Sequence, residues 1–172
     1  MTTHYALCPS PIGELVLTTD GTALTGVYMP VHKHGPEIGP DWRCDETLPV
    51  LRRAAAQLGE YFQGQRTQFD LPLSAGGSEF QHRVWAALLS IPYGGTSSYG
   101  ELARRIGTPN GSRAVGLANG RNPISIIVPC HRVIGSDGSL TGYGGGLERK
   151  RALLEFEAAV AMSGPQRMRG VA

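Results

Sequence analysis

An adjoining cysteine and histidine in the last third of the chain form its most reactive candidate pair. Cys130 and His131 belong to the motif Pro-Cys-His-Arg-Val, which follows the apolar run 124–128. A thiol attacks as its thiolate and has an ordinary pKa near ~8.5, so a reactive cysteine needs a base or a positive charge nearby. His131 is a candidate base, and Arg132 is a candidate cation. The motif indicates nucleophilic chemistry at the end of a buried strand, although a Cys-His pair is also compatible with a small buried cysteine.

A second candidate group is a glutamate on the last predicted helix, from Leu147 to about Val160. Leu147, Leu153, Leu154 and Phe156 mark the buried side of this helix, which places Glu157 on the inward face. A buried carboxylate is costly unless it is paired. Two partners remain open: an arginine in a structural ion pair, or His131, whose imidazole Glu157 would then orient.

Two further segments near the cysteine have sequences suited to positioning. Asn122 precedes Pro123, which favours extended backbone and makes Asn122 a candidate hinge between the preceding helix and the cysteine strand. The run 140–146 contains four glycines and fits backbone that comes close to a ligand. It lacks the Lys-Ser/Thr ending of a phosphate-binding loop, so we expect no nucleotide triphosphate site.

The composition limits the classes of protein to which the chain can belong. Its 172 residues suit one domain or two small ones, and 41% hydrophobic with 17% charged residues is typical of a soluble globular protein. No apolar stretch approaches the roughly 18 residues of a membrane helix, and no signal segment begins the chain, so we expect a cytoplasmic protein without membrane contact. Three cysteines without close pairing are expected to be free thiols.

The net charge of +2 is unevenly distributed. Residues 1–78 contain 5 Lys or Arg against 8 Asp or Glu, whereas residues 79–160 contain 9 against 6. An excess of this size is compatible with a solvated face and only weakly favours a polyanion such as nucleic acid.

The first part of the chain predicts a small α/β domain over residues 1–77, with 74–77 as a linker. Segments 14–19 and 23–28 alternate in polarity around Asp20-Gly21, a two-residue hairpin signal. Residues 30–45 are expected to form a long loop. Apolar residues then recur at helical spacing from Leu48 to Phe62.

The second part, residues 78–160, predicts a helical domain. Ser78 and Gln81 form a capping box before a helix whose inner face would contain Val84, Trp85, Leu88 and Leu89. Residues 161–172 are expected to be a disordered tail.

Two short helices follow, the first opened by a second capping box at Ser98 and Glu101 and the second running from Ser112 to Asn119. Joined by a tight turn, they predict a helix-turn-helix. The second helix has small residues after Arg113, which would permit either close packing on another helix or entry into the DNA minor groove.

These blocks together resemble the O6-alkylguanine-DNA alkyltransferase family, also called methylated-DNA-protein-cysteine methyltransferases, over about residues 78–157. The resemblance implies an α+β fold with two domains, of which the amino-terminal one is ribonuclease H-like and the carboxyl-terminal one winged-helix-like, with the helix-turn-helix and the active-site cysteine. The matching blocks are Phe80-Gln81, Val84-Trp85, 91–94, 98–103, 113–116, 119–123, 127–135 and 141–146.

The family resemblance also implies roles for single residues. Cys130 would accept the alkyl group, His131 would take its proton through a water molecule, Glu157 would hold the imidazole, and Asn122 would be the hinge. Arg113 would fill the base stack after the damaged nucleotide leaves it. The remaining expected residues are Tyr99, which would rotate the nucleotide and donate to the base, Ser112, Ala114 and Gly116 on the DNA, and Tyr143, Gly144, Val133 and Asn119 in the base pocket.

The implied activity is repair of DNA by direct reversal. One alkyl group would pass irreversibly from O6-alkylguanine, or O4-alkylthymine, in duplex DNA to the cysteine, after the base is flipped out. We expect a monomer that needs no cofactor and no metal, because Cys8, Cys44, His32, His34 and His82 lack ligand spacing. A non-catalytic sensor of alkylated DNA with the same fold and, less well supported, a cysteine hydrolase are the alternatives.

Overall fold

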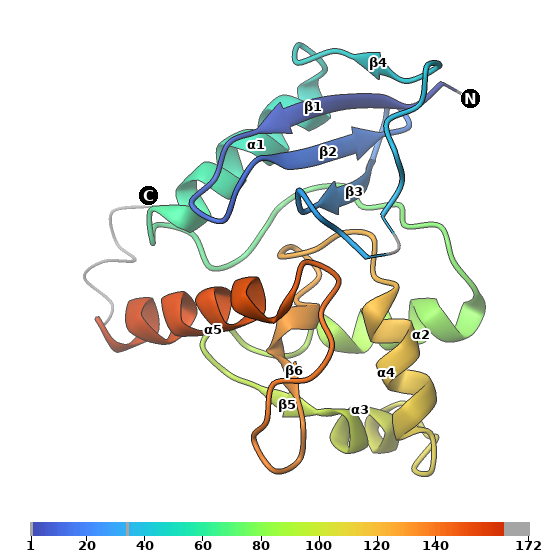
Figure 1. Cartoon of the computed structure of the whole chain (residues 1–172), viewed down its shortest axis with the longest axis vertical. Helices are drawn as coiled ribbons and strands as arrows, with labels where there is room; N and C mark the ends of the chain where they lie inside the picture. Colours follow the sequence, from blue (N-terminus) through green and yellow to red (C-terminus); the bar gives the residue numbers. More distant parts are fainter. Residues whose placement is uncertain (1, 34, 164–172) are drawn as a thin grey trace.

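A small sheet and one helix form the first part of the fold (Figure 1). The computed structural model describes residues 2–33 and 35–163. The sheet has the order β3-β2-β1-β4, in which β4 is parallel to β1 and the other pairs are antiparallel. Its elements are β1 (His4–Cys8), β2 (Leu15–Thr19), β3 (Leu24–Tyr28) and β4 (Arg43–Cys44), followed by α1 (Pro49–Phe62).

The predicted hairpin of β2 and β3 is confirmed, but its connection is longer than Asp20-Gly21. Residues 20–23 link the strands, and a register shift occurs at Thr18/Thr19. Oδ1 of Asp20 accepts the backbone N–H groups of Thr22 and Ala23, each at 2.9 Å. This side-chain-to-backbone pairing stabilises a four-residue turn.

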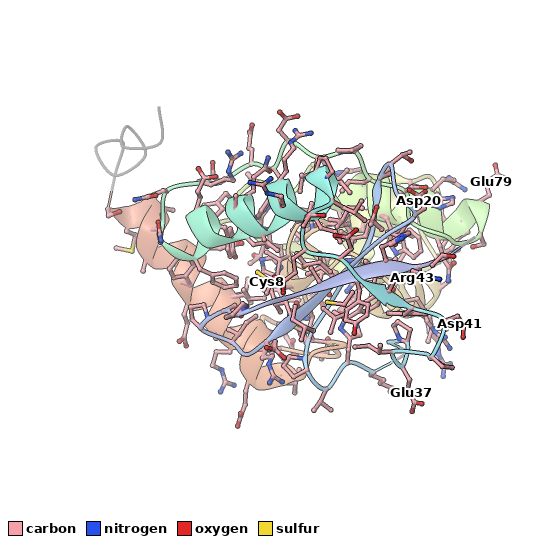
Figure 2. The ribbon with its side chains drawn as sticks, turned by 90° about the horizontal axis from the view of Figure 1, so that it is seen from above. Cys8, Asp20, Glu37, Asp41, Arg43 and Glu79 are labelled. Atoms are coloured by element: carbon pink, nitrogen blue, oxygen red, sulfur yellow. The ribbon has the colours of Figure 1, made fainter. Side chains whose placement is uncertain are left out.

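Helix α1 packs against one face of the sheet and buries its apolar stripe there. Its buried residues include Leu51, Leu58 and Tyr61. Figure 2 shows Cys8 in the interior between α1 and the strands, whereas Glu37 and Asp41 lie at the periphery in the segment before β4. The acidic side chains of this first part therefore face outward.

The second part consists mainly of helices. They are α2 (Glu79–Leu88), α3 (Tyr99–Arg105), α4 (Ser112–Gly120), the short 3₁₀ helix η1 (Cys130–Arg132) and α5 (Leu147–Met162), with a two-stranded parallel pairing of β5 (Ser97–Ser98) and β6 (Val133–Ile134). The expected mixed α+β class and the helix-turn-helix pair α3 and α4 are thus present.

The first predicted capping box is complete, and the second is half formed. Ser78 accepts the Gln81 N–H, and Oε1 of Gln81 accepts the Ser78 N–H. Ser98 likewise caps Glu101 at 3.1 Å, but the Glu101 carboxylate accepts the Ser97 hydroxyl instead of returning to the cap.

Two of the residues expected to be buried are exposed. Leu89 is 55% exposed because α2 ends at Leu88, so the next residue leaves the helical face. Leu147 is 46% exposed at the first position of α5. The buried face of α5 instead contains Lys150, Leu153, Glu157 and Val160.

The prediction that Cys130 ends a buried strand is wrong. Residues 124–128 are buried, but they form consecutive turns, with a single bridge between Ile124 and Val27. Ile126 has a φ of 71°, which no strand permits. Local hydrogen bonds satisfy this backbone, because the N–H groups of Ile127 and Val128 donate to Ser125 and Ile124. Apolar composition alone did not distinguish a buried strand from a buried turn.

The two parts of the chain share one core and one sheet edge. On β3, the Val27 N–H donates to the Pro123 carbonyl at 2.9 Å, and the Val27 carbonyl accepts the Ser125 N–H at 3.2 Å. The segment before the cysteine is therefore fixed against the sheet. No helix within residues 2–33 and 35–163 is long and apolar enough to cross a membrane. The expectations for His34 and for most of the tail, from 164 onward, lie outside the described residues.

Candidate active site

A buried carboxylate is the centre of the polar network beside Cys130. Glu157 of α5 is 1% exposed. Its Oε2 accepts from His131 Nε2 at 2.8 Å and from the Tyr61 hydroxyl at 2.6 Å. Arg132 makes a two-pronged pair with it, through Nε to Oε1 at 2.8 Å and Nη2 to Oε2 at 3.0 Å. Both partners left open by the sequence, an arginine and a histidine, are thus present.

This network fixes the protonation states of Glu157 and His131. Burial alone would raise the pKa of Glu157, but hydrogen bonds from His131 and Arg132 outweigh it and lower the pKa to about 2. The ionised carboxylate can only accept, so His131 Nε2 must donate. Burial lowers the pKa of His131, which keeps the ring neutral and leaves the lone pair on Nδ1. Nδ1 is buried without a hydrogen-bond partner among the described residues.

Cys130 begins η1, directly beside this histidine, and is 4% exposed. Burial raises the pKa of its thiol to about 11, although Asn122 and the charge of Lys150 act in the opposite direction. The resting cysteine is therefore a neutral thiol. A base must remove its proton during reaction, because no standing thiolate is available.

Asn122 connects the end of α4 to the turns before the cysteine. Its amide nitrogen donates to the Val128 carbonyl at 2.9 Å, and its oxygen accepts the Ile124 N–H at 3.0 Å. The Asn119 amide donates to the Cys130 carbonyl at 3.3 Å. Two expected site residues thereby join the helix-turn-helix to the cysteine segment.

Lys150 is a buried cation that sequence reasoning missed. Its Nζ donates to the Thr141 carbonyl at 2.7 Å and to the Gly142 carbonyl at 3.4 Å, and it lies 6.0 Å from the centre of the Tyr99 ring. Burial lowers its pKa to about 8, and its charge favours ionisation of Cys130. Lys150 therefore holds the glycine-rich loop, and its charge partly offsets the effect of burial on the pKa of the Cys130 thiol.

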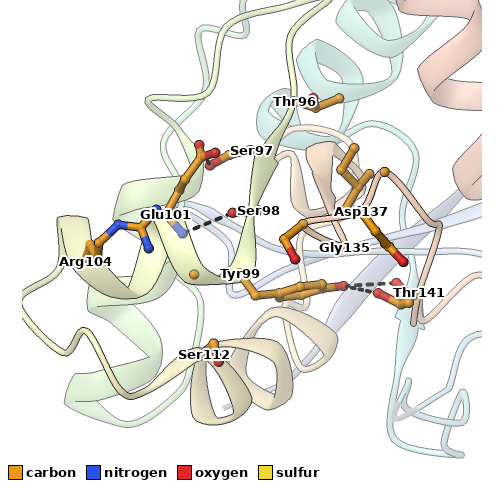
Figure 3. Close-up of a pocket in the computed structure, with 14 residues that line it drawn as sticks. Thr96, Ser97, Ser98, Tyr99, Glu101, Arg104, Ser112, Gly135, Asp137 and Thr141 are labelled. Carbon is orange, nitrogen blue, oxygen red and sulfur yellow. Dashed lines mark hydrogen bonds between the residues drawn. The ribbon is translucent and has the colours of Figure 1, made fainter.

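A polar hollow of about 880 Å³ lies between α3, the amino end of α4 and the turn 135–138 (Figure 3). Tyr99 forms one wall, where its hydroxyl donates to the Thr141 carbonyl at 3.0 Å and accepts from the Thr141 hydroxyl at 3.2 Å. Ser112 and Asp137 also line the hollow. Val133, on β6, pairs with Ser97 of β5 just before Tyr99.

A second hollow of about 790 Å³ opens on the other side of the Tyr99–Thr141 pair, which lines both. Tyr143 and Gly144 line it, as does Gly116 of α4. Burial and then the nearby Cys130 thiol raise the pKa of Tyr143 well above its ordinary value. Of the four predicted base-pocket residues, Tyr143 and Gly144 line this opening, whereas Val133 and Asn119 are buried and do not.

Helix α4 presents its first turn to solvent. Ser112, Arg113 and Ala114 are exposed, whereas Val115 and Ala118 are buried. The indole N–H of Trp85 donates to the Ala118 carbonyl at 2.9 Å and fixes α4 on α2. The inner face is thus packed on protein, and the outer face is available to a partner surface.

The residues that sequence reasoning missed were distant in the chain or carried a different expectation. Tyr61 is 96 positions from Glu157, so no local pattern pairs them. Arg132 was expected to support the thiolate but binds Glu157 and the Ile91 carbonyl. Lys150 had a detectable signal, because it lies seven residues before Glu157 on the same helical face.

Over most of its length, the chain is similar to known proteins in sequence and in fold. Residues 79–159 match the family model described as 6-O-methylguanine DNA methyltransferase, DNA binding domain, and residues 3–75 match that of its ribonuclease-like domain. A methylated-DNA–protein-cysteine methyltransferase of Mycobacterium tuberculosis is 54% identical over 92% of this chain and 94% of its own. One of Methanosarcina acetivorans is 49% identical over 91% and 99%. The crystal structure of Mycobacterium tuberculosis OGT in complex with DNA superposes with a TM-score of 0.84 at 53% identity, covering 91% of this chain and 94% of the other.

Proposed function

The chain belongs to the 6-O-methylguanine DNA methyltransferase family, and from this we propose that it repairs duplex DNA by moving an alkyl group from O6 of guanine to Cys130. The observation that carries the proposal is the buried hydrogen bond between Glu157 and His131, the residue that directly follows Cys130. The DNA-bound relative supports the same partner.

The transfer first requires that the Cys130 thiol lose its proton. The thiol of Cys130 is neutral at rest, so its proton passes to Nδ1 of His131, directly or through one water molecule. The resulting imidazolium faces the ionised Glu157, whose charge stabilises it. Arg132 and Tyr61 keep this carboxylate fixed in position and ionised.

The alkyl transfer follows as a displacement at carbon. The sulfur forms a bond to the alkyl carbon as the carbon–O6 bond breaks. The guanine leaves with the electron pair of that bond and becomes neutral by gaining one proton, which balances the proton that His131 took from Cys130. Hydrogen-bond donors on the base lower this barrier. The product is a thioether, and water cannot easily displace its sulfur, so one molecule repairs one lesion.

The alkylated nucleotide must be flipped out of the duplex, because a stacked base cannot reach a buried thiol. Arg113 occupies the exposed first turn of α4, where it can enter the stack that the base leaves. Tyr99 would receive the nucleotide, and its hydroxyl, which donates to the Thr141 carbonyl in the absence of DNA, would then donate to the base. Ser112, Ala114 and Gly116 complete the proposed DNA face.

The organisation and setting of the protein complete the proposal. Residues 1–77 and 78–160 act as two domains, which the separate matches of two family models support. A cytoplasmic location and transfer from O4-alkylthymine stay predictions. The sensor alternative is less well supported, because the chain contains Cys130 within an otherwise complete motif.

The decisive experiment measures the mass of the Cys130 peptide after incubation with duplex DNA containing O6-methylguanine. We expect a gain of one methyl group, at most one equivalent per protein, and none in Cys130→Ser. Repeated turnover, or methylation at Cys8 or Cys44 instead, would refute the mechanism.

The role of Arg113 is tested by comparing the repair rates of protein variants on duplex DNA. Arg113→Ala should slow repair of the duplex while it leaves the melting temperature unchanged, because the side chain is exposed. Arg52→Ala removes an exposed cation from α1 and serves as the charge-matched control. Equal repair rates for all three proteins would remove Arg113 from base flipping.

A further inference from the structure

A loop from the amino-terminal part of the chain contacts the glycine-rich loop of the proposed base pocket. The Lys33 N–H, in the segment after β3, donates to the Gly144 carbonyl at 2.7 Å. The next residue, Gly145, lies so close to Met29 that an ideal Cβ on it would be 2.5 Å from the Met29 Cγ. Two successive residues of the glycine-rich loop therefore lie against this segment.

His32 fills the space beside Gly144. An ideal Cβ on Gly144 would lie 2.7 Å from Nε2 of His32, closer than real Cβ atoms approach, and 3.1 Å from its Cδ2, which is tighter than most real contacts. The imidazole is fixed by its own loop, because Nδ1 accepts the Met29 N–H at 3.2 Å and the ring packs edge-on against Tyr28 at 5.3 Å. The ring thus limits where the Gly144 backbone can lie.

The pocket loop needs such external contacts. Gly142 and Gly146 have φ values of 47° and 95°, and glycine backbone loses more conformational freedom on ordering than any other residue. Lys150 holds the loop at Thr141 and Gly142, and Arg149 donates to the Gly145 carbonyl at 3.1 Å. Between these anchors, the contacts at Gly144 come from the segment that contains His32.

We propose that His32 is a positioning residue for the alkylated base: it holds the Gly144 backbone, and with it Tyr143, in the arrangement that receives the guanine. This inference rests on the proposed function. It gives the amino-terminal domain a part in base recognition, although the reacting groups lie elsewhere.

The test uses O6-benzylguanine as a free base, so that DNA binding does not enter the measurement. Single-turnover labelling of Cys130 over a range of concentrations separates the half-saturating concentration from the limiting rate. For His32→Ala we expect the half-saturating concentration to rise on the order of three- to tenfold, since the pocket loop is less often in its binding arrangement. The limiting rate should stay at the wild-type value, because the substitution leaves Cys130, His131 and Glu157 unchanged.

A double-mutant cycle gives a readout that general destabilisation does not produce. Gly144→Ala should weaken base binding in the wild-type background, where the added Cβ meets His32, and should weaken it several-fold less in His32→Ala. Val31→Ala, at a neighbouring residue that is 77% exposed, is the matched control and should behave as wild type. If His32→Ala does not fold, His32→Asn replaces it, because the amide oxygen can still accept the Met29 N–H.

The outcomes separate the two proposals. If the wild-type protein gains neither the benzyl group from the free base nor the methyl group from O6-methylguanine duplex, the proposed function fails, and this inference fails with it. If it reacts with the duplex but not with the free base, the same concentration series is run with the O6-methylguanine duplex. If the wild type reacts but His32→Ala has the same half-saturating concentration, or the two substitutions combine additively, only the role of His32 is refuted. A fall confined to the limiting rate would also refute it.

Discussion

Replacing Glu157 by glutamine tests whether its carboxylate stabilises the fold in addition to holding the His131 imidazole. Its pKa of about 2, against an ordinary value of 4.5, corresponds to roughly 3 kcal/mol in favour of the ionised form. Breaking a buried pair from one side typically costs about 3–5 kcal/mol, because the remaining charge, here Arg132, stays buried. We expect Glu157→Gln to lower the free energy of unfolding by this amount.

The assay is thermal and urea unfolding at neutral pH. At this chain length 1 kcal/mol shifts the melting temperature by roughly 2–4 °C, so a fall on the order of 6–20 °C is expected. Glu155→Gln makes the same change at an exposed position of α5 and should alter the free energy by less than about 0.5 kcal/mol. If Glu157→Gln unfolds within 1 kcal/mol of the wild type, on the order of the control, the network does not stabilise the fold as argued.

Acid unfolding gives an independent test of the same carboxylate. Because the folded pKa of Glu157 lies below the unfolded one, its stabilisation is complete above pH 4.5 and is lost as the pH falls toward about 2. The lowered pKa of His131 acts in the same direction, since protonation below 6.5 favours the unfolded chain. The wild type should therefore lose stability as the pH falls below 6.5, through His131, and further between pH 4.5 and about 2, through Glu157. Glu157→Gln should lack that part of the pH dependence, and an unchanged acid limb would contradict it.

Three further substitutions have defined outcomes. Tyr61→Phe removes the hydroxyl that donates to Glu157 Oε2 and should reduce the free energy of unfolding by about 1–3 kcal/mol in urea titrations. No change would mean that this hydrogen bond does not stabilise the fold. Lys150→Met removes the cation that favours the Cys130 thiolate, so the rate of alkylation should shift to higher pH in a pH–rate profile, and an unshifted profile would exclude this effect. Ser78→Ala removes an N-cap with a complete capping box and should cost about 1 kcal/mol without slowing alkylation of folded protein, whereas a slower reaction would implicate α2 in the site.

Local signals predicted the elements well where the chain itself supplies the stabilising contact. The capping box of Ser78 and the helix that it begins were predictable because the cap and its partner are three residues apart. The alternating strands around residue 20 were predictable for the same reason. Errors occurred where burial arises from distant segments: 124–128 is apolar because the sheet and the helices cover it, and its backbone forms turns.

The sequence by itself supplied the proposed chemistry: Cys130 as the candidate nucleophile, the adjoining His131 as the candidate base, and an inward glutamate on the last helix. These are properties of residue type and short spacing. Only the tertiary structure decided how the charges pair, because Tyr61, Arg132 and Glu157 come from three separated elements. Likewise, the contact of His32 with Gly144 depends on how a loop of the first domain packs against the second. Long-range packing, which no periodicity encodes, sets the protonation of the buried groups and the shape of the pocket.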